Sequence, residues 1–237
     1  MEDIQNLLIA SAQSAGVTVS GEQAKSFQQY MELLLNWNEK INLTAIKEPK
    51  EIAYKHFLDS ILILKYLEIP ANAKLIDVGT GAGFPGVPLK MMCPEIQLTL
   101  LDGLNKRLVF LKDLEDNLNF SAELVHARAE EAGRQRNFRG KFDFASARAV
   151  APLNLLCEYC LPFLKIGGVF IAMKGPQPEE EAEAAKKAIG LLGCELDAIK
   201  EFDLPNGDKR SLILIKRTKL LPELYPRHGS KIIKDPL

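Results

Sequence analysis

The chain has 237 residues, 47% of them hydrophobic, and its 30 Lys and Arg residues against 31 Asp and Glu leave a formal net charge of −1. A near-neutral charge excludes a protein that coats nucleic acid by bulk electrostatics, although it permits a local basic face. The chain carries no apolar run near the ~20 residues that a membrane-spanning helix needs, and its Met1-Glu2-Asp3 start is unlike a signal peptide. Four scattered cysteines fit a reducing compartment. We therefore expect a cytoplasmic protein with no membrane partner.

Residues 1–67 show helical patterns throughout and are expected to form a helical extension. Apolar spacing predicts a helix over 2–15 and a second one that starts at a capping box, Ser20 to Gln23, and ends near Asn38. A third helix opens at Pro49. Its expected inner face holds Ile52, Phe57, Ile61 and Leu64.

Residues 68–217 alternate between strand-like and helical patterns, which predicts a parallel sheet with helices on both faces. The strand-like runs are 74–78, 97–102, 122–126, 142–146 and 167–173. The helical segments between and after them are 86–93, 105–118, 151–163 and 178–191. Two more strand-like runs, Glu195–Phe202 and Ser211–Lys216, are joined by Asn206-Gly207, a strong hairpin-turn signal. The expected sheet therefore ends in an antiparallel hairpin, and 218–237 follows as a basic tail.

A glycine-rich turn joins the first strand to the next helix, where a tight turn and close approach to a ligand favour residues without a Cβ. Gly79 to Gly83 read GxGxG, the pattern of S-adenosylmethionine (SAM) enzymes, while Gly81 to Gly86 also satisfy the dinucleotide GxGxxG. Pro85 and Pro88 remove two N–H donors that a pyrophosphate would use. The closing hairpin is also typical of SAM methyltransferase domains, so the turn favours SAM.

Acidic residues at the ends of the next two strands indicate an adenosine-containing ligand. Asp102 ends the second strand, where its carboxylate can accept hydrogen bonds from both hydroxyls of a ribose, in SAM and NAD alike. The third strand leads to Ala129-Glu130, where a backbone N–H and an acid would reach an adenine. No metal is expected, because Cys157 and Cys160 lack further ligands for a zinc site.

Three alternatives stay open on these residues alone. A SAM methyltransferase acting on a small molecule would leave the basic tail unexplained. An NAD-dependent oxidoreductase would need a catalytic Tyr/Lys or Cys/His set that the sequence does not offer. A non-enzymatic RNA-binding protein could retain a methyltransferase-like shell.

Motifs far from the glycine turn point to one family. They are His56-Phe-Leu-Asp-Ser60, Ser146-Ala-Arg-Ala149, Tyr225-Pro-Arg227, Asn36-Trp-Asn38 and Asn42-Leu-Thr44. With Gly79–Gly86 they resemble the bacterial ribosomal RNA small-subunit methyltransferase G (GidB) family over nearly the whole chain. The tail departs from the family pattern after Arg227, where it reads His-Gly-Ser-Lys.

The resemblance implies a class I SAM-dependent methyltransferase fold, with a mostly parallel seven-stranded sheet. It also implies methylation of N7 of a guanine in the 530 loop of 16S rRNA. The cofactor positions expected from the resemblance and the glycine turn are Gly79, Thr80, Gly81, Gly83, Phe84, Asp102, Gly103, Leu104, Ala129, Glu130 and Arg148.

Guanine N7 carries a lone pair and no proton, so it can attack the SAM methyl in line without a general base. Catalysis would then depend on holding the reactants in near-attack geometry, worth ~7–11 kcal/mol. Arg148 and Lys174 are the catalytic candidates, expected to bind the guanine O6 edge or nearby phosphates. Alternatively, Arg148 could pair with Asp143, and Lys174 could cap the fifth strand.

RNA contacts are expected from basic residues on loops at the ligand edge of the sheet or in the tail. These are Lys106, Arg107, Arg139, Arg210, Arg227 and Lys231. The expected partner is 16S rRNA in the 30S subunit or its assembly intermediate, with the protein as a monomer. The near-neutral charge predicts weak binding to naked RNA.

Overall fold

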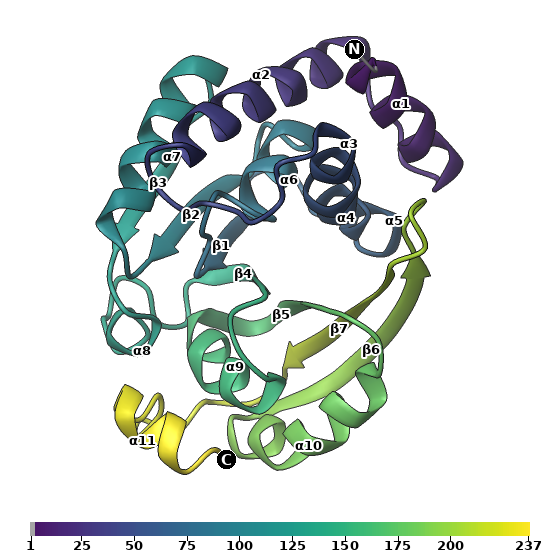
Figure 1. The fold of residues 1–237 in the computed structure, drawn as a ribbon. Coiled ribbons are helices and arrows are strands. Elements are labelled where there is room, and N and C mark those ends of the chain that lie inside the picture. Colours follow the sequence, from purple (N-terminus) through teal and green to yellow (C-terminus); the bar gives the residue numbers. More distant parts are fainter. Residues whose placement is uncertain (1–2) are drawn as a thin grey trace.

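The computed structural model describes residues 3–237, so Met1 and residue 2, with which the first predicted helix starts, lie outside the described residues. A seven-stranded sheet runs through the centre of the molecule in the order β3-β2-β1-β4-β5-β7-β6 (Figure 1). The strands are β1 (Lys74–Val78), β2 (Gln97–Asp102), β3 (Ala122–His126), β4 (Phe142–Arg148), β5 (Leu164–Lys174), β6 (Cys194–Asp203) and β7 (Lys209–Arg217). All neighbouring strands are parallel except the pairs that β7 makes with β5 and β6. The predicted fold is confirmed, including its antiparallel hairpin.

Helices cover both faces of this sheet (Figure 1). One face carries α1 (Ile4–Ser14), α2 (Gly21–Asn38), α3 (Pro49–Ile52), the π-helix η1 (Ala53–Leu58), α4 (Asp59–Ile61), α5 (Ile63–Tyr66), α6 (Gly86–Met92) and α7 (Asn105–Leu118). The other carries α8 (Ala129–Ala132), α9 (Leu153–Cys160), the 3₁₀ turn η2 (Leu161–Phe163), α10 (Pro178–Leu191) and α11 (Gly229–Lys234). Over the described part of the chain, no helix combines the length and the apolarity needed to cross a bilayer.

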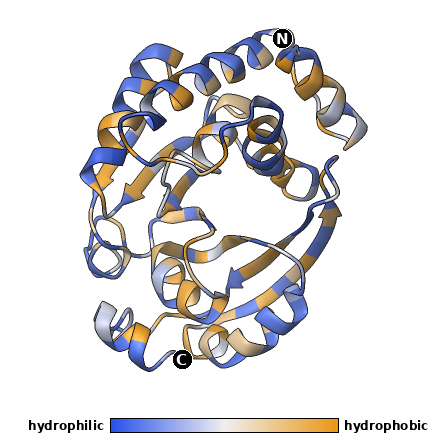
Figure 2. Cartoon of the chain, viewed as in Figure 1, coloured by the Kyte–Doolittle hydropathy of each residue, from blue (hydrophilic) through white to orange (hydrophobic). Residues whose placement is uncertain are grey.

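Two hydrophobic clusters, one on each face, follow from the period-2 alternation of strand side chains. Leu75 of β1 belongs to the cluster under α1–α7, whereas Ile76, the next residue, belongs to the cluster under α8–α11. Figure 2 shows hydrophobic colouring on the strands and hydrophilic colouring on much of the outer helical surface. The first cluster runs from Ile4 through the sheet to Leu214, so the N-terminal helices share one core with the sheet.

The third N-terminal helix is interrupted where a single α-helix is predicted. Ile52, Phe57 and Ile61 are fully buried as expected, but the chain from Ala53 to Leu58 forms a π-helix. In this segment the backbone hydrogen bonds run i→i+5 instead of i→i+4, which widens the turn. This π-helix carries Lys55 and His56 at the edge of the sheet.

The helix predicted over 151–163 is shorter than expected. It starts at Leu153, after Pro152, and ends at Cys160, because Pro162 cannot continue an α-helix and the chain turns through η2 into β5. In the loop between β4 and this helix, the backbone of Ala149 lies in the left-handed region with φ 54. The loop after β4 is therefore sharply bent at the edge of the sheet where β1 also ends.

Candidate functional site

A cavity of ≈ 500 Å³ lies at the carboxyl ends of β1, β4 and β5. Its lining residues are Leu43, Thr44, Ile46, Lys55, His56, Asp59, Gly79, Thr80, Gly81, Ala82, Phe84, Arg107, Arg148, Ala149, Met173, Lys174, Gly175 and Arg210. Ligands bind open α/β sheets at this edge, where neighbouring parallel strands diverge. The N-terminal helical extension thus supplies one wall, and the sheet and the hairpin supply the others.

Asp77 in β1 holds the glycine turn in shape. Its fully buried carboxylate accepts hydrogen bonds from Thr80 Oγ1 (2.6 Å), Gly86 N (3.1 Å) and Ser146 Oγ (2.8 Å). Burial raises the pKa of Asp77, and these donors oppose that shift. At the mouth of the turn, Gly79 has φ +68, and a Cβ there would lie 2.8 Å from a methyl of Val150. The turn accordingly requires glycine at this position.

An aromatic stack fastens the N-terminal helices to the same turn. The rings of Tyr30 and His56 stack on Phe84, with centroid distances of 5.2 Å and 4.6 Å. The Tyr30 hydroxyl donates a hydrogen bond to the Ala82 carbonyl. A Cβ on Gly83 would lie 2.6 Å from that hydroxyl, so the turn can pass Tyr30 only with glycine there. The extension is therefore part of the site.

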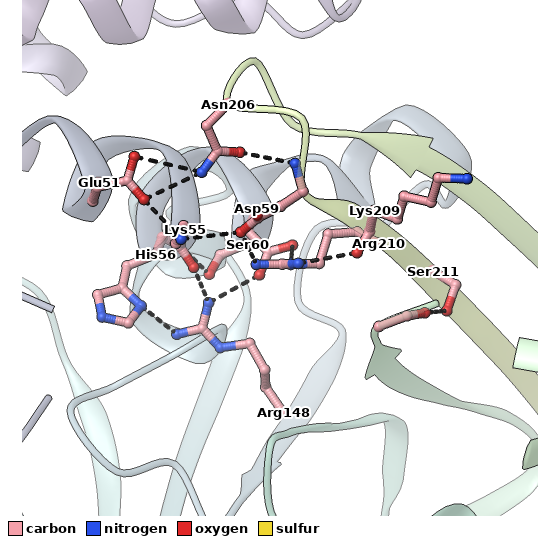
Figure 3. A network of polar contacts seen from close by, with 12 residues as sticks. Glu51, Lys55, His56, Asp59, Ser60, Arg148, Asn206, Lys209, Arg210 and Ser211 are labelled. Atoms are coloured by element: carbon pink, nitrogen blue, oxygen red, sulfur yellow. Dashed lines mark hydrogen bonds and ion pairs between the residues drawn. The ribbon is translucent and has the colours of Figure 1, made fainter. Parts of the chain in front are cut away.

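Arg148, at the end of β4, lies at the centre of a polar network that joins this extension to the hairpin (Figure 3). Its Nη1 donates to the Lys55 carbonyl (2.8 Å) and to Asp59 Oδ2 (3.2 Å). Asp59 also faces the guanidinium of Arg210 from β7, with Nε 3.6 Å from Oδ1. Burial raises the pKa of Asp59, and both arginines oppose that shift. Arg148 does not make the alternative pair with Asp143, which instead pairs with Lys165.

His56 links Arg148 to the cavity wall as a neutral imidazole. Arg148 Nη2 lies 3.0 Å from His56 Nδ1, and Thr44 Oγ1 lies 2.8 Å from His56 Nε2. Because a guanidinium can only donate, Nδ1 must be the acceptor, and the ring proton must be on Nε2. Burial and the positive charge of Arg148 lower the pKa of His56 to about 3.

Asp102 has its carboxylate at the end of β2, where a ribose would be recognised. The side chain is buried, and it accepts hydrogen bonds from Gly81 N and Leu104 N, both at 2.9 Å. Arg107 Nη1 covers the carboxylate at 3.1 Å. Asp102 thus ties the glycine turn to the loop after β2. Beside it, Leu104 presents an apolar side chain that is 43% exposed.

The predicted adenine side lies next to this position, outside the cavity lining. β2 and β3 pair in register so that Asp102 is opposite His126, and the Ala127 N–H donates to the Asp102 carbonyl (3.3 Å). Ala129 and Glu130 follow as the first turn of α8. The Glu130 carboxylate packs against Gly229, where a Cβ would lie 2.1 Å from its oxygen. The C-terminal tail therefore contacts the element predicted to hold the adenine.

Lys174, at the end of β5, is only 10% exposed and lies on the cavity wall. Its ammonium donates to the Ala151 carbonyl (2.8 Å) and pairs with Glu181 (2.9 Å). Arg107 and Arg210 also line the cavity, whereas Lys106 is an exposed neighbour of Arg107 on α7. These cations form a basic rim around the opening.

The other predicted RNA-binding residues hold the C-terminal tail. Arg139 donates to the carbonyls of Gly133, Leu221, Pro222 and Tyr225. Arg227 makes a charged pair with Glu158, whose carboxylate is fully buried in α9, at 2.8 Å. Lys231 pairs with Asp235 within the tail. Arg139 and Arg227 therefore have partners inside the fold, whereas Lys231 pairs at the surface of the tail, and none of the three lines the cavity.

Several residues that shape the site have no role that their local sequence reveals. Tyr30 lies within the second predicted helix, and Asn42-Leu-Thr44 enters only as a family motif. The tertiary contacts bring these residues and the charged pair Asp59 and Arg148 to one cavity. The available signal was the motif around His56 and Asp59, in which polar residues stand beside the apolar residues of the predicted inner face.

The cysteines show no sign of metal chemistry. Cys157 and Cys160 are buried in α9, and burial raises the pKa of both thiols well above the ordinary value. Within residues 3–237, no group of three or more His, Cys, Asp and Glu residues is arranged to hold a metal ion.

The sheet order, the closing hairpin, the glycine turn and the acid at the end of β2 define a class I SAM-dependent methyltransferase fold. Solved structures agree. TrmN from Thermus thermophilus superposes with a TM-score of 0.53 at 16% identity, over 68% of this chain and 48% of that one. A SAM-dependent methyltransferase from Aquifex aeolicus gives 0.53 at 17% identity, over 77% of this chain and 98% of that one. At these identities the likeness concerns the fold alone.

Sequence comparison gives the particular family. Residues 23–213 match the family model GidB, rRNA small subunit methyltransferase G. The Ribosomal RNA small subunit methyltransferase G of Acetivibrio thermocellus is 48% identical over 99% of this chain and 97% of that protein. The protein of the same name from Desulforamulus reducens is 45% identical over all of both chains. The chain belongs to the rRNA small subunit methyltransferase G family.

Proposed function

We propose that the protein transfers the methyl group of SAM to N7 of a guanine in the 530 loop of 16S rRNA. Family membership supports a small-subunit rRNA substrate, and the family resemblance of the sequence implies the particular loop and atom. The proposal excludes a small-molecule substrate and an oxidoreductase reaction.

The observation that carries the chemistry is the state of the acidic and imidazole groups in the cavity. Asp59 faces two guanidinium groups, and His56 has its acceptor nitrogen on Arg148. Among the described lining residues, the one imidazole therefore has no lone pair free to remove a proton, and the one carboxylate is paired with two arginines, although its Oδ1 accepts no hydrogen bond. A reaction at guanine N7 needs no such base, because N7 carries a lone pair and no hydrogen.

The residues present fit SAM as the methyl donor. Gly79 and Gly81 have positive φ and line the cavity without a Cβ at the predicted methionine side. The Asp102 carboxylate is oriented by two backbone N–H groups for the ribose, and Leu104 offers an apolar surface for the adenine. Thr80, Gly83, Phe84 and Gly103 shape the two turns between them. Bound there, SAM would supply an electrophilic methyl on a positively charged sulfur.

We further propose that Lys174 binds phosphates next to the guanine and that Arg148 acts at the guanine site through its contacts with His56 and Asp59. Arg107, Arg210 and Lys106 would contact the RNA backbone at the rim. Contacts from Arg139, Arg227 and Lys231 remain predictions. The internal partners of these three make an indirect role, through the shape of the tail, part of the proposal. The substrate would be the 30S subunit or its assembly intermediate, bound by a monomer.

The test is nucleoside analysis of 16S rRNA from a strain that lacks the gene. We expect 7-methylguanosine at the 530 loop to disappear, and to return when the purified protein and SAM are added to the mutant 30S subunits. Naked 16S rRNA should be methylated more slowly, because the protein carries no excess positive charge. Persistence of the modification in the deletion strain would refute the proposal.

A further inference from the structure

Thr44 presents a hydroxyl to the cavity whose hydrogen-bonding role is set by its neighbours. It lies on the loop between α2 and α3 and lines the cavity together with the glycine turn. Asn38 holds its backbone from both sides, since Asn38 Nδ2 donates to the Thr44 carbonyl (2.9 Å) and Asn38 Oδ1 accepts from the Thr44 N–H (3.0 Å). The hydroxyl is therefore carried by a fixed piece of backbone.

Both lone pairs of this oxygen are already used. The Ile46 N–H donates to Thr44 Oγ1 at 3.0 Å, and His56 Nε2 lies 2.8 Å from the same oxygen. Because Arg148 donates to His56 Nδ1, the imidazole can only donate through Nε2. A threonine hydroxyl has two acceptor sites and one proton, so only the proton remains available.

A chain of hydrogen bonds thus fixes the polarity of the Thr44 hydroxyl. The buried Asp59 orients Arg148, and Arg148 sets the tautomer of His56. The His56 Nε2–H then donates to a lone pair of Thr44 Oγ1 (Asp59, Arg148 and His56 are drawn in Figure 3). The hydroxyl cannot turn around to accept a hydrogen bond without breaking one of these contacts. It is a permanent donor on the wall that faces the glycine turn.

We propose that Thr44 donates a hydrogen bond to O6 of the target guanine and so selects guanine over adenine at this site. The inference rests on the proposed function. On the edge of guanine that carries N7, the neighbouring group is the O6 acceptor, whereas adenine has an amino donor at that position. If N7 faces the methyl donor at the glycine turn, the adjacent group meets the cavity wall. A donor that cannot become an acceptor pairs with O6 and leaves an adenine amino group unpaired.

With Thr44 on O6, Arg148 acts on the base through His56, as a positioning residue. Its Nη1 is shared between the Lys55 carbonyl and Asp59, and its Nη2 is on His56. Lys174 and Arg210, which also line the cavity, are then candidates for contacts with phosphates.

A double-mutant cycle between the protein and the base tests this contact. The variants are Thr44→Val, which removes the hydroxyl, and Thr44→Ser, which retains it. The substrates are 30S subunits reconstituted with guanine, 2-aminopurine or hypoxanthine at the target nucleotide. 2-Aminopurine lacks O6, whereas hypoxanthine keeps O6 and lacks only the exocyclic amine. SAM affinity by calorimetry and the melting temperature report any structural damage.

For the wild type we expect kcat/KM to fall about tenfold from guanine to 2-aminopurine, the usual effect of one lost hydrogen bond. Thr44→Val should have a lower kcat/KM than the wild type on guanine, and its kcat/KM should not fall further on 2-aminopurine. Thr44→Ser should show the same kcat/KM values as the wild type. The change in kcat/KM from guanine to hypoxanthine should be the same for all three proteins. A purely structural role for Thr44 would slow all substrates by one factor.

Equal losses from guanine to 2-aminopurine in the wild type and in Thr44→Val would overturn the inference while leaving the proposed function intact. If wild-type protein and SAM produce no 7-methylguanosine in the guanine subunits, the proposed function itself fails, and the inference fails with it.

Discussion

Acidification should destabilise the protein through His56. The folded state holds this imidazole neutral, with its pKa lowered to about 3 from an ordinary value of 6.5. Protonation would place an N–H on Nδ1 against the guanidinium of Arg148, which is only 15% exposed. Below pH 6.5, His56 is therefore protonated in the unfolded chain but stays neutral in the folded chain.

The size of this effect follows from the two pKa values. Above pH 6.5 both states are neutral at His56, so the residue adds no pH dependence. Below it, the unfolded state is stabilised by about 1.4 kcal/mol per pH unit until the pH reaches the folded pKa. At pH 5 the loss of stability from this one residue is about 2 kcal/mol, the product of 1.5 units and that slope.

The assay is urea denaturation of the wild type and of His56→Gln between pH 7.5 and pH 5. Glutamine keeps one donor and one acceptor but does not titrate, so carboxylates and other histidines cancel in the difference between the two proteins. Relative to His56→Gln, the wild type should lose about 2 kcal/mol of unfolding free energy between pH 7.5 and pH 5. Parallel curves for the two proteins would show that His56 is not held neutral by Arg148.

Three further predictions concern the charged pair, the glycine turn and the tail. Asp59→Asn leaves the guanidinium groups of Arg148 and Arg210 without their buried counter-charge, and it should lower the free energy of unfolding by about 3–5 kcal/mol. The control is Asp116→Asn, at an exposed position of α7, which should leave the denaturation midpoint near that of the wild type. Gly79→Asp should abolish SAM binding in calorimetry, because its side chain would project at Val150 and into the cavity. The control is Gly167→Asp, at an equally positive φ with open space around it. Arg139→Ala removes the donor to four carbonyls and should lower stability by about 1.5–3 kcal/mol, and subtilisin should then remove the C-terminal tail faster.

Each of these has a result that contradicts it. Equal denaturation midpoints for Asp59→Asn and Asp116→Asn would mean that the pairs of Asp59 with Arg148 and Arg210 are solvated and contribute little to stability. Wild-type SAM affinity in Gly79→Asp would rule out the glycine turn as the methionine site. If cleavage of the tail in Arg139→Ala occurs at the wild-type rate, the packing of Tyr225 and Ile232 in the core is sufficient to hold it.

The architecture was predictable because its determinants are local. Strands and helices differ in the period of their apolar residues, and the hairpin and the glycine turn have residue requirements at fixed spacing. The predicted helices differ from the observed ones at the π-helix Ala53–Leu58, which a 3.6-residue period does not predict, and at Pro162, where a proline ends a helix early. Asp102 could be placed for the same reason, since the end of an apolar strand fixes its position along the sheet.

The detailed site could not be read in this way, because its contacts join segments that are far apart in the chain. A basic residue such as Arg139 or Arg227 looks the same in sequence whether it faces RNA or binds carbonyls and a buried carboxylate. What the sequence by itself determined is the fold, the family and the edge of the sheet at which a ligand is expected to bind, all from short-range patterns. Only the tertiary structure decided that Thr44, His56 and Arg148 form one hydrogen-bonded chain, because a hydrogen bond requires two partners at a set distance and these partners lie up to 92 positions apart in the sequence.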